Sequence, residues 1–389
     1  MTLSRSVSLS FAPLLAFAGL GLFWGAIAAQ VPLLKAGIGV DDGAFGLALL
    51  CGAVGALGAM YVAPLLDMRL GARAIQICAV LVALAFLFPG LAPTLPLFGL
   101  AMFFCGGSSG LLDVIMNARL SRIEAEHDTG LMSLNHAVYS FAYAGAALAS
   151  GLLRDAGVAP FQVFVFVGVL MVALSFGMVT AAPVSTLDDD PAGRGGYLAV
   201  AIWTGLITMI AFMTEQSTES WSALHIERTL GGSATEGALG PTLLGLTMGI
   251  GRLAGHYATP RGREGVSILF AALVTAVGTG LVAVAPTQTL AYVGFAILGF
   301  GVSVIAPLAI ALAGRSVRPR DRALAVSRTV MVGYVGFFIG PPMMGFISEA
   351  TSLRGSYGVM AALMLASPLC LLALRRPARP VSPTPPQIP

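Results

Sequence analysis

Apolar residues fill long, nearly uninterrupted runs along this 389-residue chain, and most polar residues gather between the runs. An α-helix of about 20 apolar residues crosses the roughly 30 Å hydrocarbon core of a bilayer. Twelve runs are close to that length, so the pattern predicts an all-α membrane protein with twelve transmembrane helices. The runs cover residues 11–34, 43–66, 74–92, 97–118, 131–152, 160–182, 197–221, 237–257, 265–285, 288–314, 323–348 and 357–374.

One polar segment, PVSTLDDDPAGRGG, divides the twelve runs into two sets of six. Its proline, glycine and aspartate content is typical of a linker. We therefore expect one six-helix bundle within residues 1–182, a linker over 183–196 and a second six-helix bundle over 197–374. The remaining residues, 375–389, are rich in proline and are expected to be disordered.

The charged residues indicate how the chain lies in its membrane. Only 10% of the residues are charged and 57% are hydrophobic, whereas about 25% are charged in an average soluble domain. Lipid is therefore the expected solvent. The net charge of +3 comes from short basic patches between apolar runs, which report orientation and do not indicate a nucleic-acid partner. Seventeen of the 21 basic residues fall on one side of the twelve-helix arrangement. By the positive-inside rule we expect both termini and the linker to lie on the cytoplasmic side of an inner membrane.

Several function classes have no support in the sequence. The four cysteines lie inside apolar runs without a CxxC or a Cys/His cluster, so no metal site or disulfide framework is expected. Hydrolase, metalloprotease and nucleotide-binding motifs are absent from the sequence, which argues against an enzyme and against a cofactor. If such a protein moves a small-molecule substrate, the energy must come from an ion gradient or the substrate must run downhill. We expect a monomer whose partners are lipid, protons and that substrate.

A weak internal repeat supports the division into halves. The end of the second run reads AMYVAPLLDMRLGAR and the end of the eighth reads GRLAGHYATPRGREG, with Gly71 and Gly262 set among arginines. Over essentially its whole length the chain resembles the major facilitator superfamily of transporters. The first segment is similar to that family's cytoplasmic Gly-x-x-x-Asp-Arg-x-Gly signature, with Ala63 in place of glycine and one additional residue before Gly71. The second has Thr259 in place of the acidic residue. The resemblance implies a gating role for Asp67, Arg69, Arg73 and Arg261.

A narrower resemblance comes from GLLDVIMNA, LMSLNHAVYS and GYVGFFIGPPMMGFISEATSLR. Together they look like the branch that includes fucose-permease-type proton symporters. In that branch an acidic residue of the fourth helix is followed four places later by asparagine, as in Asp113 and Asn117. The same branch includes many bacterial permeases. The resemblance implies a proton symporter in a bacterial inner membrane, and among small polar solutes it favours a sugar as the substrate.

Ionisable residues inside the apolar runs are the candidates for coupling. A charge in the hydrocarbon costs about 2.5–3.5 kcal/mol even on insertion scales, so such a residue normally faces a cavity or a partner. Burial favours the neutral form of Asp113, which would let it bind and release a proton. His136 can change charge near neutral pH, and Glu215 belongs to a polar cluster toward the periplasmic end. The alternative for each is a hydrogen bond or ion pair that only fixes packing.

Polar and aromatic neighbours of these residues are candidates for binding the substrate. Amides, carboxylates and an aromatic ring suit a polyhydroxylated or a cationic solute. We expect Trp221 to be an interfacial anchor and Arg252 to mark the cytoplasmic boundary. The candidate substrate-binding residues are Asn117, Asn135, Trp24, Gln30, Gln216 and Glu219.

Three functions stay open at this stage. The first is a proton-coupled symporter that moves a small polar solute by alternating access. The second is a proton-driven efflux antiporter for amphipathic compounds. Many exporters have a Gly-Pro-x-x-Gly-Gly-like element in the fifth helix, whereas here the GPP element lies in the eleventh run. The third is a membrane sensor that keeps the fold without transporting.

Overall fold

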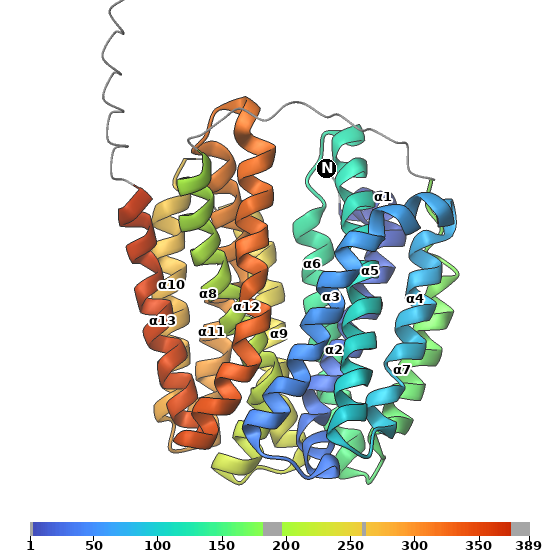
Figure 1. Ribbon diagram of the computed structural model, residues 1–389, viewed down its shortest axis with the longest axis vertical. Helices are drawn as coiled ribbons and strands as arrows, with labels where there is room; N and C mark the ends of the chain where they lie inside the picture. The colour runs from blue at the N-terminus through green and yellow to red at the C-terminus, as the bar shows by residue number, and fades with distance from the viewer. Residues whose placement is uncertain (1–2, 182–196, 259–261, 375–389) are drawn as a thin grey trace, which may run out of the picture.

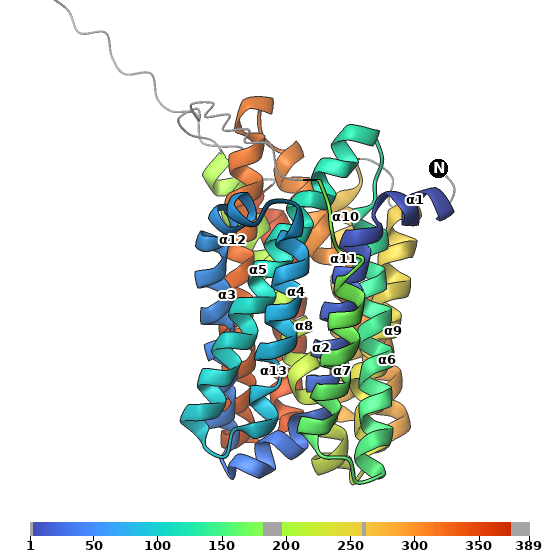
Figure 2. The ribbon, with the colours of Figure 1, turned by 90° about the vertical axis from the view of Figure 1, so that its right-hand side faces the viewer.

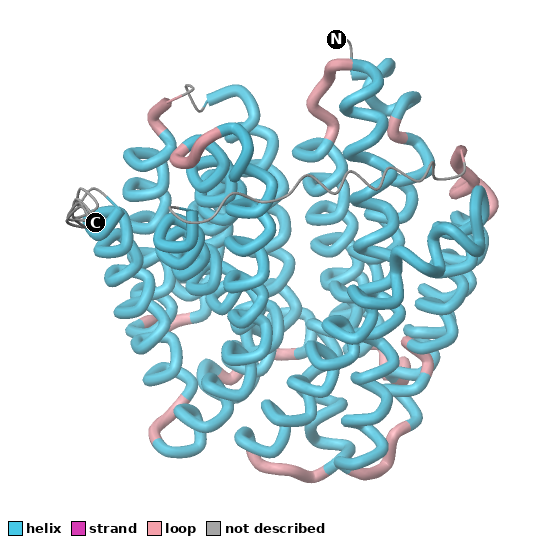
Figure 3. The backbone as a smooth tube through the Cα atoms, turned by 45° about the horizontal axis from the view of Figure 1, so that its top comes forward, coloured by secondary structure: helices cyan, strands magenta, loops and turns pink. Residues whose placement is uncertain are grey.

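The computed structural model describes residues 3–181, 197–258 and 262–374. The predicted linker over 183–196, the predicted tail over 375–389 and Arg261 therefore lie outside the described residues. The described residues form helices and loops without a strand, and a short α1 precedes twelve longer helices (Figure 3). The prediction of an all-α, twelve-helix protein is confirmed.

The helices are α1 (Leu3–Leu9), α2 (Phe11–Ile38), α3 (Asp42–Leu70), α4 (Ala74–Ala85), α5 (Leu95–His127), α6 (Met132–Asp155), α7 (Pro160–Ser175), α8 (Tyr197–Leu224), α9 (Ala234–Ala258), α10 (Glu264–Val284), α11 (Gln288–Arg315), α12 (Arg322–Ala350) and α13 (Leu353–Leu374). Short 3₁₀ turns cover Gly71–Arg73, Phe88–Leu91 and Pro319–Asp321, and a π-helical turn, η3, covers His225–Thr229. Eight segments, one of them running from α3 through α4, are long and apolar enough to cross a membrane by length and composition alone. The 16-residue α7 is apolar but shorter. Helices α6 and α9 fall outside that set because their polar residues lower their hydropathy, and they pack against each other between the halves.

Contacts between helices repeat with a shift of six (Figure 1). Helix α2 packs on α6 as α8 packs on α12, and α3 packs on α5 as α9 packs on α11. The contacts that join the two sets are equivalent in the same way, because α3 meets α12 and α6 meets α9. Two similar six-helix groups, α2–α7 and α8–α13, therefore face each other.

The helices run between two ends of the molecule (Figure 2). We call the end with the N-terminus, at the top of Figure 1, the N-terminal face, and the other end the opposite face. The two groups lie closest near the opposite face and diverge toward the N-terminal face (Figure 1). Gly71 and Gly262, which the repeat sets at matching places, both have positive φ, 58° and 91°, a region that favours glycine.

Small residues allow the helices to approach closely. An ideal Cβ on Gly106 of α5 would lie only 1.8 Å from the carbonyl oxygen of Gly52 on α3. In the same way, a Cβ on Gly25 of α2 would lie 2.1 Å from the carbonyl oxygen of Tyr143 on α6. These backbone-to-backbone contacts are typical of helix packing in lipid, where small residues take the place of a hydrophobic driving force.

Candidate functional site

A cavity of about 300 Å³ lies between the two helix groups. Helices α2, α3, α5 and α6 line it from the first group, and α8, α9 and α12 line it from the second. Most of its wall is apolar and aromatic, with few polar side chains, as is usual for small-molecule sites. Six of the candidate coupling and substrate-binding residues line it, namely Trp24, Asp113, His136, Glu215, Gln216 and Glu219.

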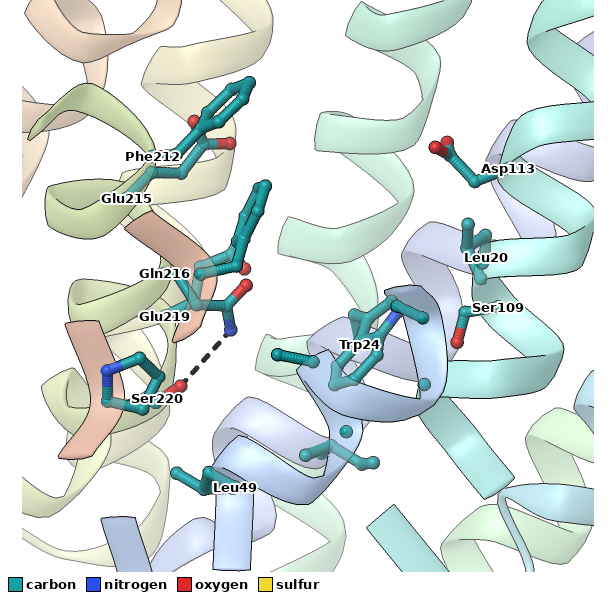
Figure 4. A pocket seen from close by; sticks show the side chains of 18 of the residues that line it. Leu20, Trp24, Leu49, Ser109, Asp113, Phe212, Glu215, Gln216, Glu219 and Ser220 are labelled. Atoms are coloured by element: carbon teal, nitrogen blue, oxygen red, sulfur yellow. Dashed lines mark hydrogen bonds between the residues drawn. The ribbon is translucent and has the colours of Figure 1, made fainter. Parts of the chain in front are cut away.

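Asp113 extends from α5 toward this cavity (Figure 4). Its Oδ1 accepts a hydrogen bond of 3.0 Å from Nδ2 of Asn117, and the same nitrogen donates to the Asp113 main-chain oxygen at 2.8 Å. The four-residue spacing thus places the two side chains on one face of the helix. Among the described residues no basic side chain forms an ion pair with Asp113. Asn117 orients the carboxylate and does not itself line the cavity.

Glu215 and Arg252 form an ion pair on the opposite wall. Nη2 of Arg252 lies 3.0 Å from Oε1 of Glu215, and each side chain is 14% exposed. The other arm of the guanidinium, Nη1, donates to the main-chain oxygen of His136 at 3.3 Å and to Oγ of Ser140. Arg252 therefore joins α8, α9 and α6 inside the molecule, and the prediction that it marks a boundary is wrong. A guanidinium can hold several acceptors at once because its donors form a rigid planar fork.

His136 packs its ring edge-on against Phe17, with 4.7 Å between the ring centroids. In the part of the chain that the structure describes, no hydrogen bond joins this ring to Asp113. In this arrangement the His136 ring and Asp113 therefore have no direct hydrogen bond along which a proton could pass. The main-chain oxygen of His136 instead accepts hydrogen bonds from Arg252 and from Oγ of Ser140.

Glu219 lies one helical turn after Glu215 on α8. It is 9% exposed and lines the cavity, and no described residue donates a hydrogen bond to it or pairs with it. Beside it, Nε2 of Gln216 donates to Oγ of Ser220 at 3.3 Å (Figure 4). Trp24 extends into the cavity from α2, in the other helix group.

The remaining candidates for substrate binding lie away from the cavity. Gln30 and Asn135 are fully buried and are not among the cavity residues. The Gln30 amide has no hydrogen-bond partner among the described residues, while Asn135 donates to the main-chain oxygen of Leu131 at 2.9 Å. Trp221 is also fully buried, edge-on to Phe45 of the other helix group at 5.9 Å. The prediction that Trp221 anchors the protein at a membrane surface is wrong, because a buried ring packs between the halves.

The predicted gating residues near the N-terminal face do not form one cluster. Asp67 forms a 2.6 Å ion pair with Arg119, one of the seventeen basic residues that the sequence analysis counted only as indicators of orientation. Arg119 is 4% exposed and also donates to the main-chain oxygens of Gly71, at 3.0 Å, and of Ala181. Arg69 and Arg73 are exposed. The Asp67–Arg119 pair therefore lies within the first helix group.

Near the opposite face, ion pairs join the two groups. Arg228 donates to both carboxylate oxygens of Asp42, at 2.8 and 2.6 Å, and Lys35 lies 3.1 Å from the same carboxylate. Arg154 binds both carboxylate oxygens of Glu227, at 2.7 and 2.9 Å. Both Glu227 and Arg228 belong to the π-helical turn η3, and such turns are frequent at functional sites.

The sequence reasoning missed this network, which we call the opposite-face network. The only sign of these ion pairs in the sequence is that acidic residues lie near Lys35, Arg154 and Arg228 in the chain. This sign is weak, because the positive-inside rule already accounts for basic residues at helix ends.

Comparisons with known proteins agree with this architecture. A family model described as Major Facilitator Superfamily matches residues 204–389. An uncharacterized MFS-type transporter of Yersinia pestis is 31% identical over 360 residues, covering 90% of this chain and 92% of the relative. The membrane protein MosC of Rhizobium meliloti is 25% identical over 343 residues, covering 86% and 82%.

Two solved structures share the fold. One is a bacterial homologue of the human lysosomal transporter Spinster, with 17% identity, a TM-score of 0.68 and 96% of each chain covered. The other is the nucleoside transporter NupG, with 13% identity, a TM-score of 0.72 and coverage of 95% of this chain and all of that one. The relative in Yersinia pestis, together with twelve helices in two matching groups around a central cavity, shows that this chain belongs to the major facilitator superfamily and is a multi-pass membrane transporter of small molecules, not an enzyme.

Proposed function

We propose that this protein is a proton-coupled secondary transporter that moves a small polar solute by alternating access between its two helix groups. The observation that carries the proposal is Asp113, a carboxylate at the central cavity whose one hydrogen-bond partner in the described residues is the neutral Asn117. A carboxylate without a cation at low dielectric is stabilised by binding a proton. As the halves rock, the same group exchanges that proton with either side of the membrane.

Glu215 is less suited to the central role because Arg252 balances its charge. In this proposal Glu215 and Arg252 hold the wall of α8 and α9 against α6, and His136 lies beside the route of the proton. Removal of a proton from Asp113 changes the charge of the cavity by one unit. The affinity for the solute then depends on whether Asp113 is protonated, and this dependence couples the two fluxes.

Orientation follows from the basic residues. The sequence pattern assigns seventeen of the 21 basic residues to the side of the membrane that holds both termini and residues 183–196. This bias supports a cytoplasmic location for that side, and therefore for the N-terminal face. The bundles of residues 1–182 and 197–374 then act as two bodies in an inner membrane. In this proposal the opposite-face network joins these bodies on the periplasmic side, and their arrangement is the conformation that opens toward the cytoplasm.

Different observations favour different directions of transport and different solutes. The spacing of Asp113 and Asn117 resembles that of fucose-permease-type symporters and favours uptake of a sugar. The aromatic wall of the cavity favours the second candidate, an efflux antiporter for amphipathic compounds. The names of the solved relatives give no common cargo, since one is a nucleoside transporter and another a human organic anion transporter.

Proton flux in proteoliposomes tests the proposal. Solutes from several chemical classes are added to vesicles that contain the purified protein and a trapped pH-sensitive dye. A symported solute acidifies the lumen as it enters, whereas entry in exchange for protons makes the lumen more alkaline. For the solute that responds, we expect Asp113→Asn to abolish accumulation driven by a pH gradient while exchange of labelled for unlabelled solute continues.

Asp128→Asn is the matched control, because Asp128 is an exposed carboxylate in the loop after α5. It removes one carboxylate without touching the cavity and is expected to transport like the unmodified protein. If Asp113→Asn keeps full gradient-driven accumulation, Asp113 does not carry the coupling proton and the proposal is wrong.

A further inference from the structure

Glu219 differs from every other buried acid in the described residues. Four acidic side chains are buried there, and three of them form ion pairs: Asp42 with Arg228, Glu264 with Arg315 and Asp321 with Arg320. Glu219 is 91% buried by the same measure and has neither an ion pair nor a hydrogen bond with a described residue. A buried carboxylate normally has a partner because its desolvation is costly. The partner of Glu219 is then either a proton, as proposed for Asp113, or a cationic group that enters the cavity, and the surroundings of Glu219 decide between them.

A count of charges indicates which kind of partner is missing. The cavity is lined by three carboxylates, Asp113, Glu215 and Glu219, by one arginine, Arg252, and by the ring of His136, which is counted as neutral. Arg252 balances Glu215 at 3.0 Å. In the proposed function a proton neutralises Asp113. One negative charge remains, on Glu219, and a single positive charge on the solute would balance it.

The surroundings of Glu219 suit such a charge when it is attached to an apolar body. Phe212, Gln216 and Glu219 follow one another at helical spacing on α8, so they form one stripe that faces the cavity (Figure 4). Phe212 stacks on Phe337 of α12 with 4.7 Å between ring centroids, and Trp24 faces the cavity from α2. Aromatic faces attract organic cations as well as apolar groups. Gln216 and Ser220 supply hydrogen-bonding groups beside the carboxylate.

We propose that the solute of this transporter is a small organic cation with a single positive charge, and that Glu219 binds that charge. This inference rests on the proposed function, in which Asp113 carries the proton. The cavity volume of about 300 Å³ is at the lower end of the roughly 300–1,000 Å³ range of small-molecule sites, so the solute is a small amine. Both an aromatic amine and an amino sugar meet these requirements, whereas a neutral sugar leaves Glu219 without a counter-charge.

Binding to the purified full-length protein at pH 7 tests this inference. The probes are small monovalent organic cations, each with a neutral partner of similar shape, such as phenethylamine with 2-phenylethanol and glucosamine with glucose. Thermal stabilisation identifies the probes that bind, and calorimetric titration measures their affinity. We expect stabilisation by cations and not by their neutral partners. We expect Glu219→Gln to weaken the binding of such a cation about tenfold or more, as for loss of a buried charge partner.

Two variants control for the fold. Glu219→Asp keeps the charge and is expected to retain part of the affinity, and Glu126→Gln changes an exposed glutamate and is expected to have no effect. Three outcomes would overturn the inference: stabilisation by neutral members equal to that by their cationic partners, cation binding that Glu219→Gln leaves unchanged, or a panel in which no cation is preferred.

The binding test of Glu219 and the transport test of Asp113 can fail independently of each other. Binding is measured in detergent without a gradient, so loss of coupling through Asp113 would not alter it. Conversely, a neutral sugar that binds well and moves with protons would reject Glu219 as a cation site while the proposed coupling stands.

Discussion

At the scale of single residues, the partner of a charged side chain decides what the side chain can do. The sequence identified Asp113, Glu215 and Glu219 because each is an acid within or beside an apolar run. It did not show that Glu215 has a counter-charge and Glu219 has none, since Arg252 is 37 positions away in the chain. Hydropathy reports whether a position lies in the membrane, but not which helix lies opposite it. For that reason Arg252 was expected at the boundary, and Arg119 was not expected to pair with Asp67.

The Arg252–Glu215 pair gives a prediction about stability. Arg252→Met leaves Glu215 facing the cavity without its cation and removes the hydrogen bonds to α6. We expect this variant to be less stable by about 1–3 kcal/mol, the usual cost of leaving a largely buried polar group without a partner. Adding Glu215→Gln to it removes the unpaired charge, and the double variant is expected to recover part of the loss. Thermal unfolding of the purified proteins in detergent measures both effects.

Arg69→Met provides the comparison, because Arg69 is exposed at the N-terminal face and its replacement should change stability by less than about 0.5 kcal/mol. A single variant Arg252→Met that unfolds like the unmodified protein would mean that the ion pair contributes nothing to the fold.

At the scale of helices, the sequence predicts number and order well but predicts ends poorly. All twelve predicted runs overlap a helix, because the requirement to satisfy backbone hydrogen bonds in lipid leaves helices as the simplest solution. The fourth run was expected to end at residue 118, whereas α5 continues to His127. The sixth was expected to reach 182, whereas α7 ends at Ser175. An apolar run marks the thickness of the lipid, and a helix can extend past it or end before it.

Contacts between helices depend on a few glycines, and the sequence alone does not show which of the many glycines these are. Gly106→Ala would place a methyl group 1.8 Å from the Gly52 carbonyl oxygen of α3 and force α3 and α5 apart. We expect a loss of about 1–3 kcal/mol, as for other overpacked sites. Gly58→Ala, on α3, meets nothing within 4 Å and should not destabilise the protein, since alanine favours a helix over glycine by about 0.5–1 kcal/mol. The yield of folded, monodisperse protein and the thermal midpoint distinguish the two. Equal behaviour of both variants would contradict the close contact between α3 and α5.

At the scale of the whole molecule, the arrangement of two six-helix groups follows from the repeat, but the state in which they rest does not. The residues that hold the groups together near the opposite face are far apart in the sequence, such as Arg154 with Glu227 and Asp42 with Arg228. Each is a charged residue near a helix end, for which orientation is a sufficient explanation. Only the three-dimensional arrangement identifies them as contacts between the groups. Both pairs involve η3, so this short π-helical turn connects α8 to two helices of the first group.

The Arg154–Glu227 pair tests whether this network sets the resting conformation. Glu227→Gln removes a bidentate ion pair that exists only while the groups meet near the opposite face. A loss of about 1–3 kcal/mol is expected for such charged hydrogen bonds. Because about 1.4 kcal/mol is a tenfold change in population, a few per cent of molecules with this end open would become a large fraction. Spin labels at positions 156 and 350, which are exposed on the two groups near this face, would report that fraction as a longer distance.

Exchanging the two charges separates the contribution of this pair from a general loss of stability. Arg154→Glu combined with Glu227→Arg places the same charges on opposite groups, so the double variant can form an ion pair again and should recover much of the short-distance population. Arg154→Glu alone leaves two acids facing each other and should open this end further than Glu227→Gln does. If all three variants show the distances of the unmodified protein, the pair does not hold the groups together. The resting state would then be set by the packing of Trp221 on Phe45 and by the contact of α3 with α12.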